Sequence, residues 1–213
     1  MRSLLCLLLF PCAALFAYQP ASDRSGFLLG NQDQLSLEQV PLAAAPEPEA
    51  DQEPASLFSQ VRGRAENGDL DAEAQLGVMY YWGQEAPLDY SKAMFWLHRA
   101  ADAGQRDAQA KLGAMYFLGQ GTAADEAEAI HWFRKAAEQG EPYSQGCIGL
   151  MYIVGHGVPQ DLPTAFFWLY QAAAGGDQDA AAPLRAVKTR LSVEQLEDGV
   201  RRAEAAIHSH TQR

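Results

Sequence analysis

The stretch AKLGAMYFLGQG at residues 110–121 decides the fold, because near copies of it stand 36 residues to either side. The earlier copy is AQLGVMYYWG at residues 74–83, and the later copy is GCIGLMYIVGHG at residues 146–157. Each copy keeps a Gly, then a Met-Tyr pair, then a second Gly at the same spacing. So many coincidences at one offset exclude chance, and we infer three full repeats of 36 residues.

A second repeated block follows each copy and has a Trp near its middle. The three blocks are KAMFWLHRAADAG (92–104), EAIHWFRKAAEQG (128–140) and TAFFWLYQAAAGG (164–176). Apolar residues recur in both kinds of block at helical spacing, and turns rich in Gly separate them, so each repeat is predicted to form two helices. The first helices are expected near 70–82, 106–118 and 142–154, and the second near 90–103, 126–139 and 162–174.

Short side chains and glycines mark the expected helix ends. Asp89, Asp125 and Asp161 stand just before the second helices, where a carboxylate can accept hydrogen bonds from the N–H groups of the first turn. Four glycines 36 residues apart follow the second helices, where the chain needs a left-handed residue. These glycines are Gly68, Gly104, Gly140 and Gly176.

Residues at fixed repeat positions predict how the helices pack. Trp96, Trp132 and Trp168 are expected to fill the space between layers, and the glycine at position 77 and its equivalents let two helices approach closely. One helix pair cannot bury its apolar face alone, so stacked neighbours must share a continuous core. The expected fold class is therefore an all-α solenoid.

Additional helices are expected at both ends of the repeats. A half-repeat helix carrying Leu57 and Val61 is predicted after Pro54. After the third repeat, residues 177–191 align with a first helix, but Pro183 makes that helix start late. Ser192 and Gln195 then predict a capping box for a last helix over 193–208. The two histidines after position 207 are expected to lie in a fraying polar tail; they are His208 and His210.

The two repeated blocks resemble Sel1-like repeats, a branch of the tetratricopeptide-type helical repeats. The resemblance covers roughly residues 57–190 and departs from the family pattern at Glu85, which replaces the second loop glycine of the first repeat. It implies a right-handed α-α superhelix of three repeats with capping helices, used as a scaffold for protein partners and often found in bacterial envelopes. The family has no shared catalytic residues.

The first 17 residues have the pattern of a secretory signal peptide. Arg2 supplies a positive start, an apolar run follows at residues 4–10, and small residues precede position 18. A retained N-terminal anchor or an ordinary buried helix is the alternative. Cleavage would remove Cys6 and Cys12 and leave Cys147 as the one cysteine, so no internal disulfide is expected. The mature protein is therefore expected in the periplasm or outside the cell.

Composition changes divide the rest of the chain. Residues 18–54 carry seven acidic residues against Arg24 alone and are rich in Pro and Ala, which predicts a disordered linker. The predicted domains are a signal peptide at 1–17, this linker at 18–54, the repeat solenoid at 55–191, and a C-terminal capping helix and tail at 192–213.

The acidic balance of the chain limits its partners. It has 27 Asp and Glu against 16 Lys and Arg, a formal net charge of −11. Loss of Arg2 with the signal peptide makes this −12, since 15 minus 27 is −12. Nucleic acid is excluded as a partner, because binding phosphates needs clustered positive charge. We expect a monomer without stable membrane insertion after signal cleavage.

The sequence offers little that could carry catalysis. The five histidines fit no zinc-binding pattern, and the chain has no cysteine pair at zinc spacing. Cys147 has no evident His or cationic neighbour to lower its pKa, and it is interpreted as an incidental or structural thiol that need not lie in the core. No metal or cofactor is expected, and the protein is predicted not to be an enzyme.

Positions that differ between the repeats predict where a partner binds. In the first helices these positions form stripes at spacing i, i+4, i+7 and i+11, each on one helix face. In tetratricopeptide-like superhelices the first helices line the concave surface, so the stripes would form a groove. Trp82 and Tyr143 are the expected aromatic anchors; alternatively, Trp82 packs beneath a loop. The candidate site residues are Asp71, Gln75, Val78, Trp82, Asp107, Lys111, Leu118, Tyr143 and Leu150.

The leading hypothesis is an exported adaptor or regulator of the bacterial cell envelope that binds a protein or peptide in this groove. One version is a periplasmic, immunity-type antagonist that masks a basic toxin, in keeping with the negative charge. A hydrolase acting on cell-wall-related substrates is an alternative that lacks a catalytic constellation. A third hypothesis is self-association through the solenoid ends, which the terminal helix would block.

Overall fold

The computed structural model describes residues 56–212, and all of its regular elements within that range are helices. The predicted signal peptide at 1–17 and linker at 18–54 lie outside the described residues. Three helix pairs carry the repeats: α4 (Leu70–Trp82) with α5 (Tyr90–Asp102), α6 (Arg106–Leu118) with α7 (Glu126–Ala137), and α8 (Pro142–Val154) with α9 (Leu162–Ala174). Before them comes α3 (Leu57–Glu66), and after them come α10 (Ala181–Lys188) and α11 (Val193–Thr211).

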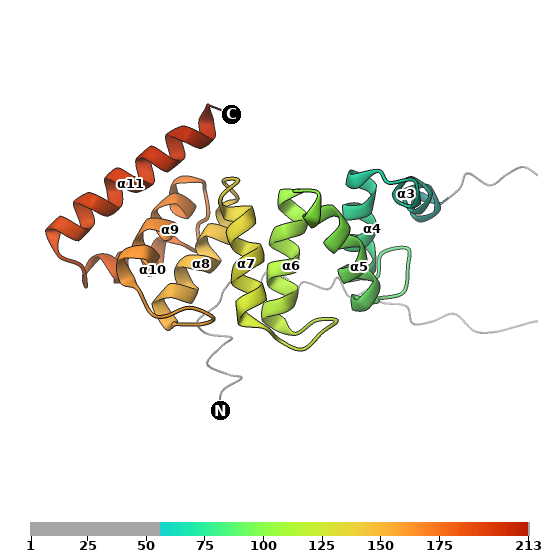
Figure 1. The fold of residues 1–213 in the computed structure, drawn as a ribbon, viewed down its shortest axis with the longest axis horizontal. Helices are drawn as coiled ribbons and strands as arrows, with labels where there is room; N and C mark the ends of the chain where they lie inside the picture. The colour runs from blue at the N-terminus through green and yellow to red at the C-terminus, as the bar shows by residue number, and fades with distance from the viewer. Residues whose placement is uncertain (1–55, 213) are drawn as a thin grey trace, which may run out of the picture.

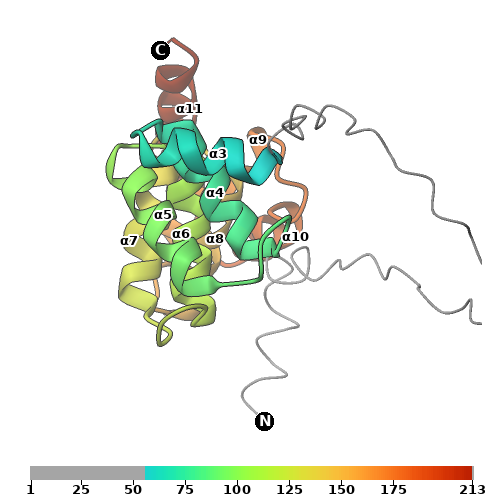
Figure 2. The ribbon, with the colours of Figure 1, turned by 90° about the vertical axis from the view of Figure 1, so that its right-hand side faces the viewer.

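The pairs stack along the long axis of the molecule in chain order, with α3 at one end and α11 at the other (Figure 1). Figure 2 looks along this stack from the α3 end. Each helix pair packs most extensively within itself and then against the next helix of the chain. The predicted first and second helices are confirmed, and the fold is an all-α repeat solenoid.

The predicted aspartate caps hold the start of each second helix. Asp89 accepts a hydrogen bond of 3.0 Å from the N–H of Lys92, and Asp161 accepts one of 3.2 Å from that of Thr164. Asp125 accepts two, from the first turn of α7. These bonds satisfy N–H groups that have no partner within the helix, so each second helix starts at the same place in its repeat.

Close contact within each pair requires the repeated glycine in the first helix. A Cβ built on Gly113 would lie 2.6 Å from the Phe133 ring, and one built on Gly77 would lie 2.7 Å from the Leu97 side chain. Such distances are shorter than any van der Waals contact, so a larger residue here would force the two helices apart. The expectation that this glycine permits close approach is confirmed.

The three tryptophans have equivalent surroundings, one layer apart. Trp96 packs against the cluster that joins α3 to α4, Trp132 lies in the cluster that joins α5 to α6, and Trp168 packs against the cluster that joins α7 to α8. Each Trp therefore belongs to one repeat and covers the core of the repeat before it. This confirms that the tryptophans fill the space between layers and that neighbouring repeats share one core.

A buried polar position in the first helices is a feature that the sequence reasoning missed. Gln109 donates a hydrogen bond of 3.0 Å to the Ala101 carbonyl, and Gln145 donates one of 3.1 Å to the Ala137 carbonyl. Both amides thereby tie a first helix to the end of the preceding second helix. The signal was available, because a long polar residue recurs at this position in all three repeats.

The C-terminal end follows the prediction in part. The helix α10 starts late, as Pro183 indicated, and α11 begins with the predicted capping box, in which Ser192 and Gln195 exchange hydrogen bonds. However, α11 continues to Thr211, and His210 Nε2 donates a hydrogen bond of 3.0 Å to the carbonyl of Glu138, the residue that follows α7. The expectation of a fraying tail at His210 is therefore wrong, because the chain gains a contact with the C-terminal end of α7.

Candidate functional site

A pocket of about 570 Å³ opens where α3, α4 and α6 face one another. We call it the N-terminal groove. Its lining includes five side chains that are buried in the core beneath it. They are Val61 of α3, Ala74 and Met79 of α4, Leu97 of α5 and Ala108 of α6. The groove thus has an apolar floor formed by two successive layers of the solenoid.

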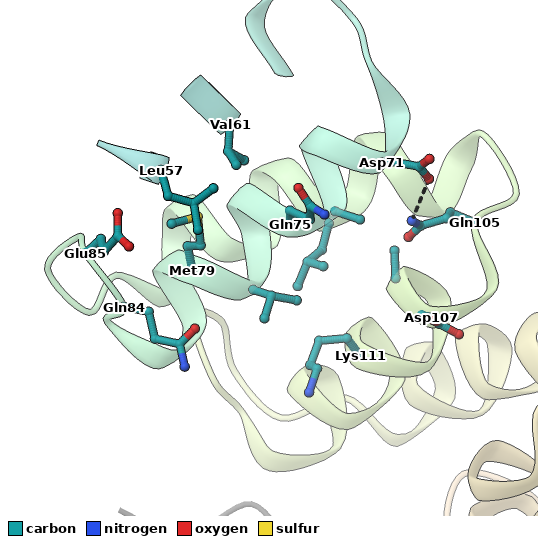
Figure 3. A pocket seen from close by; sticks show the side chains of 14 residues that line it. Leu57, Val61, Asp71, Gln75, Met79, Gln84, Glu85, Gln105, Asp107 and Lys111 are labelled. Carbon is teal, nitrogen blue, oxygen red and sulfur yellow. Dashed lines mark hydrogen bonds between the residues drawn. The ribbon is translucent and has the colours of Figure 1, made fainter. Parts of the chain in front are cut away.

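Polar and acidic side chains form the two ends of this groove (Figure 3). Asp71, Gln105 and Asp107 gather at one end, and Gln84 and Glu85 lie at the other. Gln105 Nε2 donates a weak hydrogen bond of 3.5 Å to the Asp71 carboxylate. Asp71 and Asp107 occupy the same position in the first turns of α4 and α6, so each layer presents one carboxylate to the groove.

Lys111 of α6 is the one lysine or arginine that lines the N-terminal groove. Its Nζ atom lies 4.9 Å from the centre of the Tyr81 ring and 5.5 Å from that of the Trp82 ring, and it points away from Asp107 (Figure 3). Burial lowers the pKa of the Lys111 ammonium from 10.5 to about 8, because removal from water disfavours the charged form. The two aromatic faces offset part of that penalty.

The structure brings five of the nine predicted site residues together. Asp71, Gln75, Val78, Asp107 and Lys111 all line the N-terminal groove. This supports the assignment of the first-helix stripes to a common surface, for the first two repeats.

The other four predicted residues lie outside the pocket. Trp82 is 38% exposed and contacts the Lys111 ammonium, which lines the groove. Leu118 is exposed on α6. Tyr143 and Leu150 are half-buried and pack against the core that joins α7 to α8, with the Tyr143 ring 6.2 Å from that of Phe133.

Two stripe positions are buried rather than open. Cys147 is 4% exposed and Ala114 is 5% exposed, and both belong to the core between α7 and α8. The expectation that Cys147 need not be a core residue is therefore wrong. The stripes of the second and third repeats are thus buried in part, since Leu118 and Val154 at their ends remain exposed.

Several residues of the groove could not be assigned from the repeat pattern. Leu57 and Val61 come from the half-repeat helix α3, while Gln84, Glu85 and Gln105 come from the segments between helices. These residues lie outside the first helices of the repeats, so differences between the first helices could not point to them. A usable signal existed for Glu85 alone, as the departure from the loop glycine of the other repeats.

A second hollow, of about 670 Å³, lies between α9, the end of α10 and α11. Apolar side chains of Phe166, Leu196 and Val200 line it, with charged residues of both signs around them. It lies outside the repeat stripes.

Between residues 56 and 212, no three His, Cys, Asp or Glu side chains are placed to hold a metal ion. None of the helices in this range has the length and apolar character needed to cross a membrane.

Fold and groove together define a class of protein: an α-helical repeat solenoid with an open hollow between its first layers. The family model for the Sel1 repeat matches residues 70–105, 106–141 and 146–177. The chain belongs to the Sel1 repeat family. Proteins of this family generally act as scaffolds for protein–protein interaction, and their fold is typically non-catalytic.

Two solved structures illustrate the similarity. A Sel1 repeat protein from Oxalobacter formigenes is 34% identical, with a TM-score of 0.56, and the match covers 61% of this chain and 97% of that one. The protective antigen c5321 from uropathogenic Escherichia coli is 31% identical, with a TM-score of 0.62. That match covers 73% of this chain and 32% of the antigen, so this chain spans about a third of its length. Among curated proteins there is no match.

Proposed function

We propose that the protein is an exported adaptor or regulator of the bacterial cell envelope, which holds a segment of another protein in the N-terminal groove. Its site of action is the periplasm or the outside of the cell. The observation that carries this proposal is the groove itself, which has an apolar floor and polar ends. Gln75 and Lys111 border it at a repeat position that holds a different residue in each copy. Its volume of about 570 Å³ lies in the range of ligand pockets.

The contrast between floor and ends supports binding rather than packing. Residues shared by all repeats are used in the core, as the tryptophans and the close-contact glycines show. Gln75 and Lys111 share one repeat position and border the groove, yet they differ in chemistry. A position that shared packing does not fix is available for recognition of a partner.

In this proposal the chain binds and does not catalyse. Cys147, the candidate nucleophile, is buried in the core and out of reach of a substrate. His98 packs against Trp132 and its Nε2 atom lies 2.9 Å from the Tyr116 hydroxyl, a contact that joins two repeats. Cys147 and His98 thus both have a structural use.

The export part of the proposal rests on the signal-peptide pattern of residues 1–17. Fractionation of cells that make the full chain, followed by mass spectrometry of its N-terminus, tests it. We expect an envelope or secreted form that begins near residue 18. A chain that keeps Met1 and remains in the cytoplasm would contradict export. It would not contradict binding of a partner in the groove.

Site-specific photocrosslinking tests the adaptor function. A photoreactive residue at Gln75, in the groove, is compared with one at Gln178, an exposed residue after α9 at the other end of the solenoid. In the native cell we expect a defined crosslinked protein from position 75 and none of the same mass from position 178. The same products from both positions, or none from position 75, would refute the assignment of the groove.

A further inference from the structure

The N-terminal groove has a distribution of charge that limits what it can hold. Carboxylates of Asp71 and Asp107 stand at one end of the apolar floor and that of Glu85 stands at the other (Figure 3). The side chain of Lys111 is the single cationic group in the lining. Outside the lining, Arg106 Nε lies 3.1 Å from the Asp107 carboxylate, whose side chain remains 79% exposed. Three carboxylates against Lys111 and this one arginine leave the groove with a net negative charge.

Lys111 does little to neutralise the carboxylates. Its ammonium points away from Asp107 and lies over the rings of Tyr81 and Trp82. Burial also lowers the pKa of this ammonium to about 8, so its charge begins to be lost just above neutral pH. A cation brought by a ligand would add to the weak hydrogen bond at Asp71 and to the existing contacts of Asp107 with Arg106 and of Glu85 with the Phe58 N–H.

We infer that the N-terminal groove binds a peptide segment in which cationic side chains flank one or two aliphatic side chains. The aliphatic part would cover Leu57, which is exposed, and Val78, which is half-buried. The cations would reach the carboxylates at the two ends. This inference rests on the proposed function, because it names the partner class of the same groove. An apolar contact supplies most of the affinity, while the charges set orientation and specificity.

Charge also excludes two other occupants of the groove. The chain's own residues 18–54 contain seven acidic residues and Arg24 alone, so they would be repelled by the acidic ends. A second copy of the chain brings a net charge of −11 and meets the same repulsion. A basic segment of another protein is therefore the occupant that fits.

Pools of peptides with uncharged, blocked termini provide a direct test of binding to the full chain. Each pool is a mixture of peptides ten residues long. Every peptide has two randomised aliphatic positions, and the positions on both sides of them are fixed as charged or neutral residues. The fixed residues are Lys or Arg in the first pool, Glu in the second and Ser in the third. Binding is followed by shifts of backbone amide NMR signals in α4 and α6, at two salt concentrations. We expect the cationic pool alone to bind, and to bind more weakly at high salt.

The double variant Asp71→Asn, Asp107→Asn removes two charges from the groove. The double variant Asp102→Asn, Glu138→Gln removes two charges from exposed helix ends outside its lining and is the matched control. We expect the groove variant to weaken binding of the cationic pool about tenfold, from two exposed ion pairs, and the control to weaken it less than twofold. Thermal unfolding of both variants verifies that they are folded.

Each other outcome overturns the inference. Equal binding of the Glu or Ser pool shows that charge does not select the ligand, and equal weakening by both double variants shows unspecific attraction. If no pool binds, the groove does not take this class of segment. The photocrosslink from Gln75 distinguishes failure of this inference from failure of the adaptor function. A captured segment that is acidic or neutral refutes the cationic ligand alone. If no protein is captured, the adaptor function is refuted as well.

Discussion

Glu85 Oε2 accepts a hydrogen bond of 3.0 Å from the backbone N–H of Phe58, in the first turn of α3. In the other two repeats this loop position is a glycine that lies against backbone. A Cβ built on Gly121 would lie 2.7 Å from the Tyr90 carbonyl oxygen, and one built on Gly157 would lie 2.5 Å from that of Glu126. A side chain is impossible at these two places.

The first repeat tolerates Glu85 because the helix before it is shorter. Shifted by the repeat length of 36 residues, the start of α5 at Tyr90 corresponds to position 54, whereas α3 begins at Leu57. The Glu85 carboxylate accepts the Phe58 N–H and so caps the first turn of α3. Glu85 keeps the left-handed conformation of the glycines, with φ of 55°, so the loop retains its shape.

Substitution of Glu85 should loosen α3. We expect Glu85→Ala to lower the free energy of unfolding by about 1 kcal/mol, the usual value of a lost N-terminal cap, and to speed amide exchange at Phe58. Glu85→Gln retains an acceptor oxygen and serves as the control. Identical exchange in the Ala and Gln variants would show that the carboxylate does not hold this helix.

Arg99 compensates a buried charge at the repeated polar position. Glu73 stands where Gln109 and Gln145 donate to backbone carbonyls, its side chain is 2% exposed, and it lies 2.5 Å from Arg99 Nη2. We expect Arg99→Ala to destabilise the protein by about 3 kcal/mol, because a buried carboxylate is left without its partner. The measurement is urea-induced unfolding.

A double-mutant cycle isolates this ion pair. Glu73→Gln gives the first repeat the residue of the other two, so it should be nearly neutral. In that background Arg99→Ala should lower the free energy of unfolding by less than about 1 kcal/mol, the range of surface contacts. An unchanged effect of Arg99→Ala would mean that the arginine stabilises the fold through its contact with the Trp96 ring instead.

Lys111 should make stability depend on pH. Its pKa of about 8 in the folded protein is below the ordinary 10.5, so the folded state binds fewer protons than the unfolded state between these values, and stability from this group rises with pH there. Lys111→Met should therefore be more stable than the native chain at pH 7, by about 1–3 kcal/mol. The difference should shrink by pH 10. Urea unfolding of both proteins at the two pH values measures it, and a constant difference would contradict the assigned cause.

Gly199 should be essential for docking of α11. A Cβ at this position would lie 2.5 Å from the Phe166 ring of α9, so Gly199→Ala forces the helices apart and should destabilise by about 1–3 kcal/mol. Gly63 in α3 is the matched control, because a Cβ there meets nothing within 4 Å. Gly63→Ala should stabilise by about 0.5–1 kcal/mol through helix propensity. Thermal unfolding distinguishes the two, and stabilisation by both would show that α11 tolerates displacement.

The terminal helix illustrates where sequence reasoning ended. Its capping box could be predicted because Ser192 and Gln195 are three residues apart and interact within one turn. Its docking could not, because α11 has no equivalent in the repeats. The contacts of Gly199 with Phe166 and of His210 with Glu138 join residues far apart in the chain.

The candidate site shows the same division. Asp71, Gln75 and Lys111 were found by comparing repeats, since residues at one repeat position occupy equivalent places in space. Burial of Cys147 and the half-burial of Tyr143 depend on which side chains of α7 lie opposite. A stripe on one helix contains no information about its neighbour's side chains.

The amino-acid sequence by itself determined the repeat length, the helix pairs and their caps, because periodicity and capping act over a few residues and recur three times. Only the tertiary structure decided where the stack stays open and where it closes. Whether a layer is open depends on its contacts with the short helix α3, with the half-buried Lys111 and with the last helix α11, which has no equivalent in the repeats. Those contacts link distant parts of the chain.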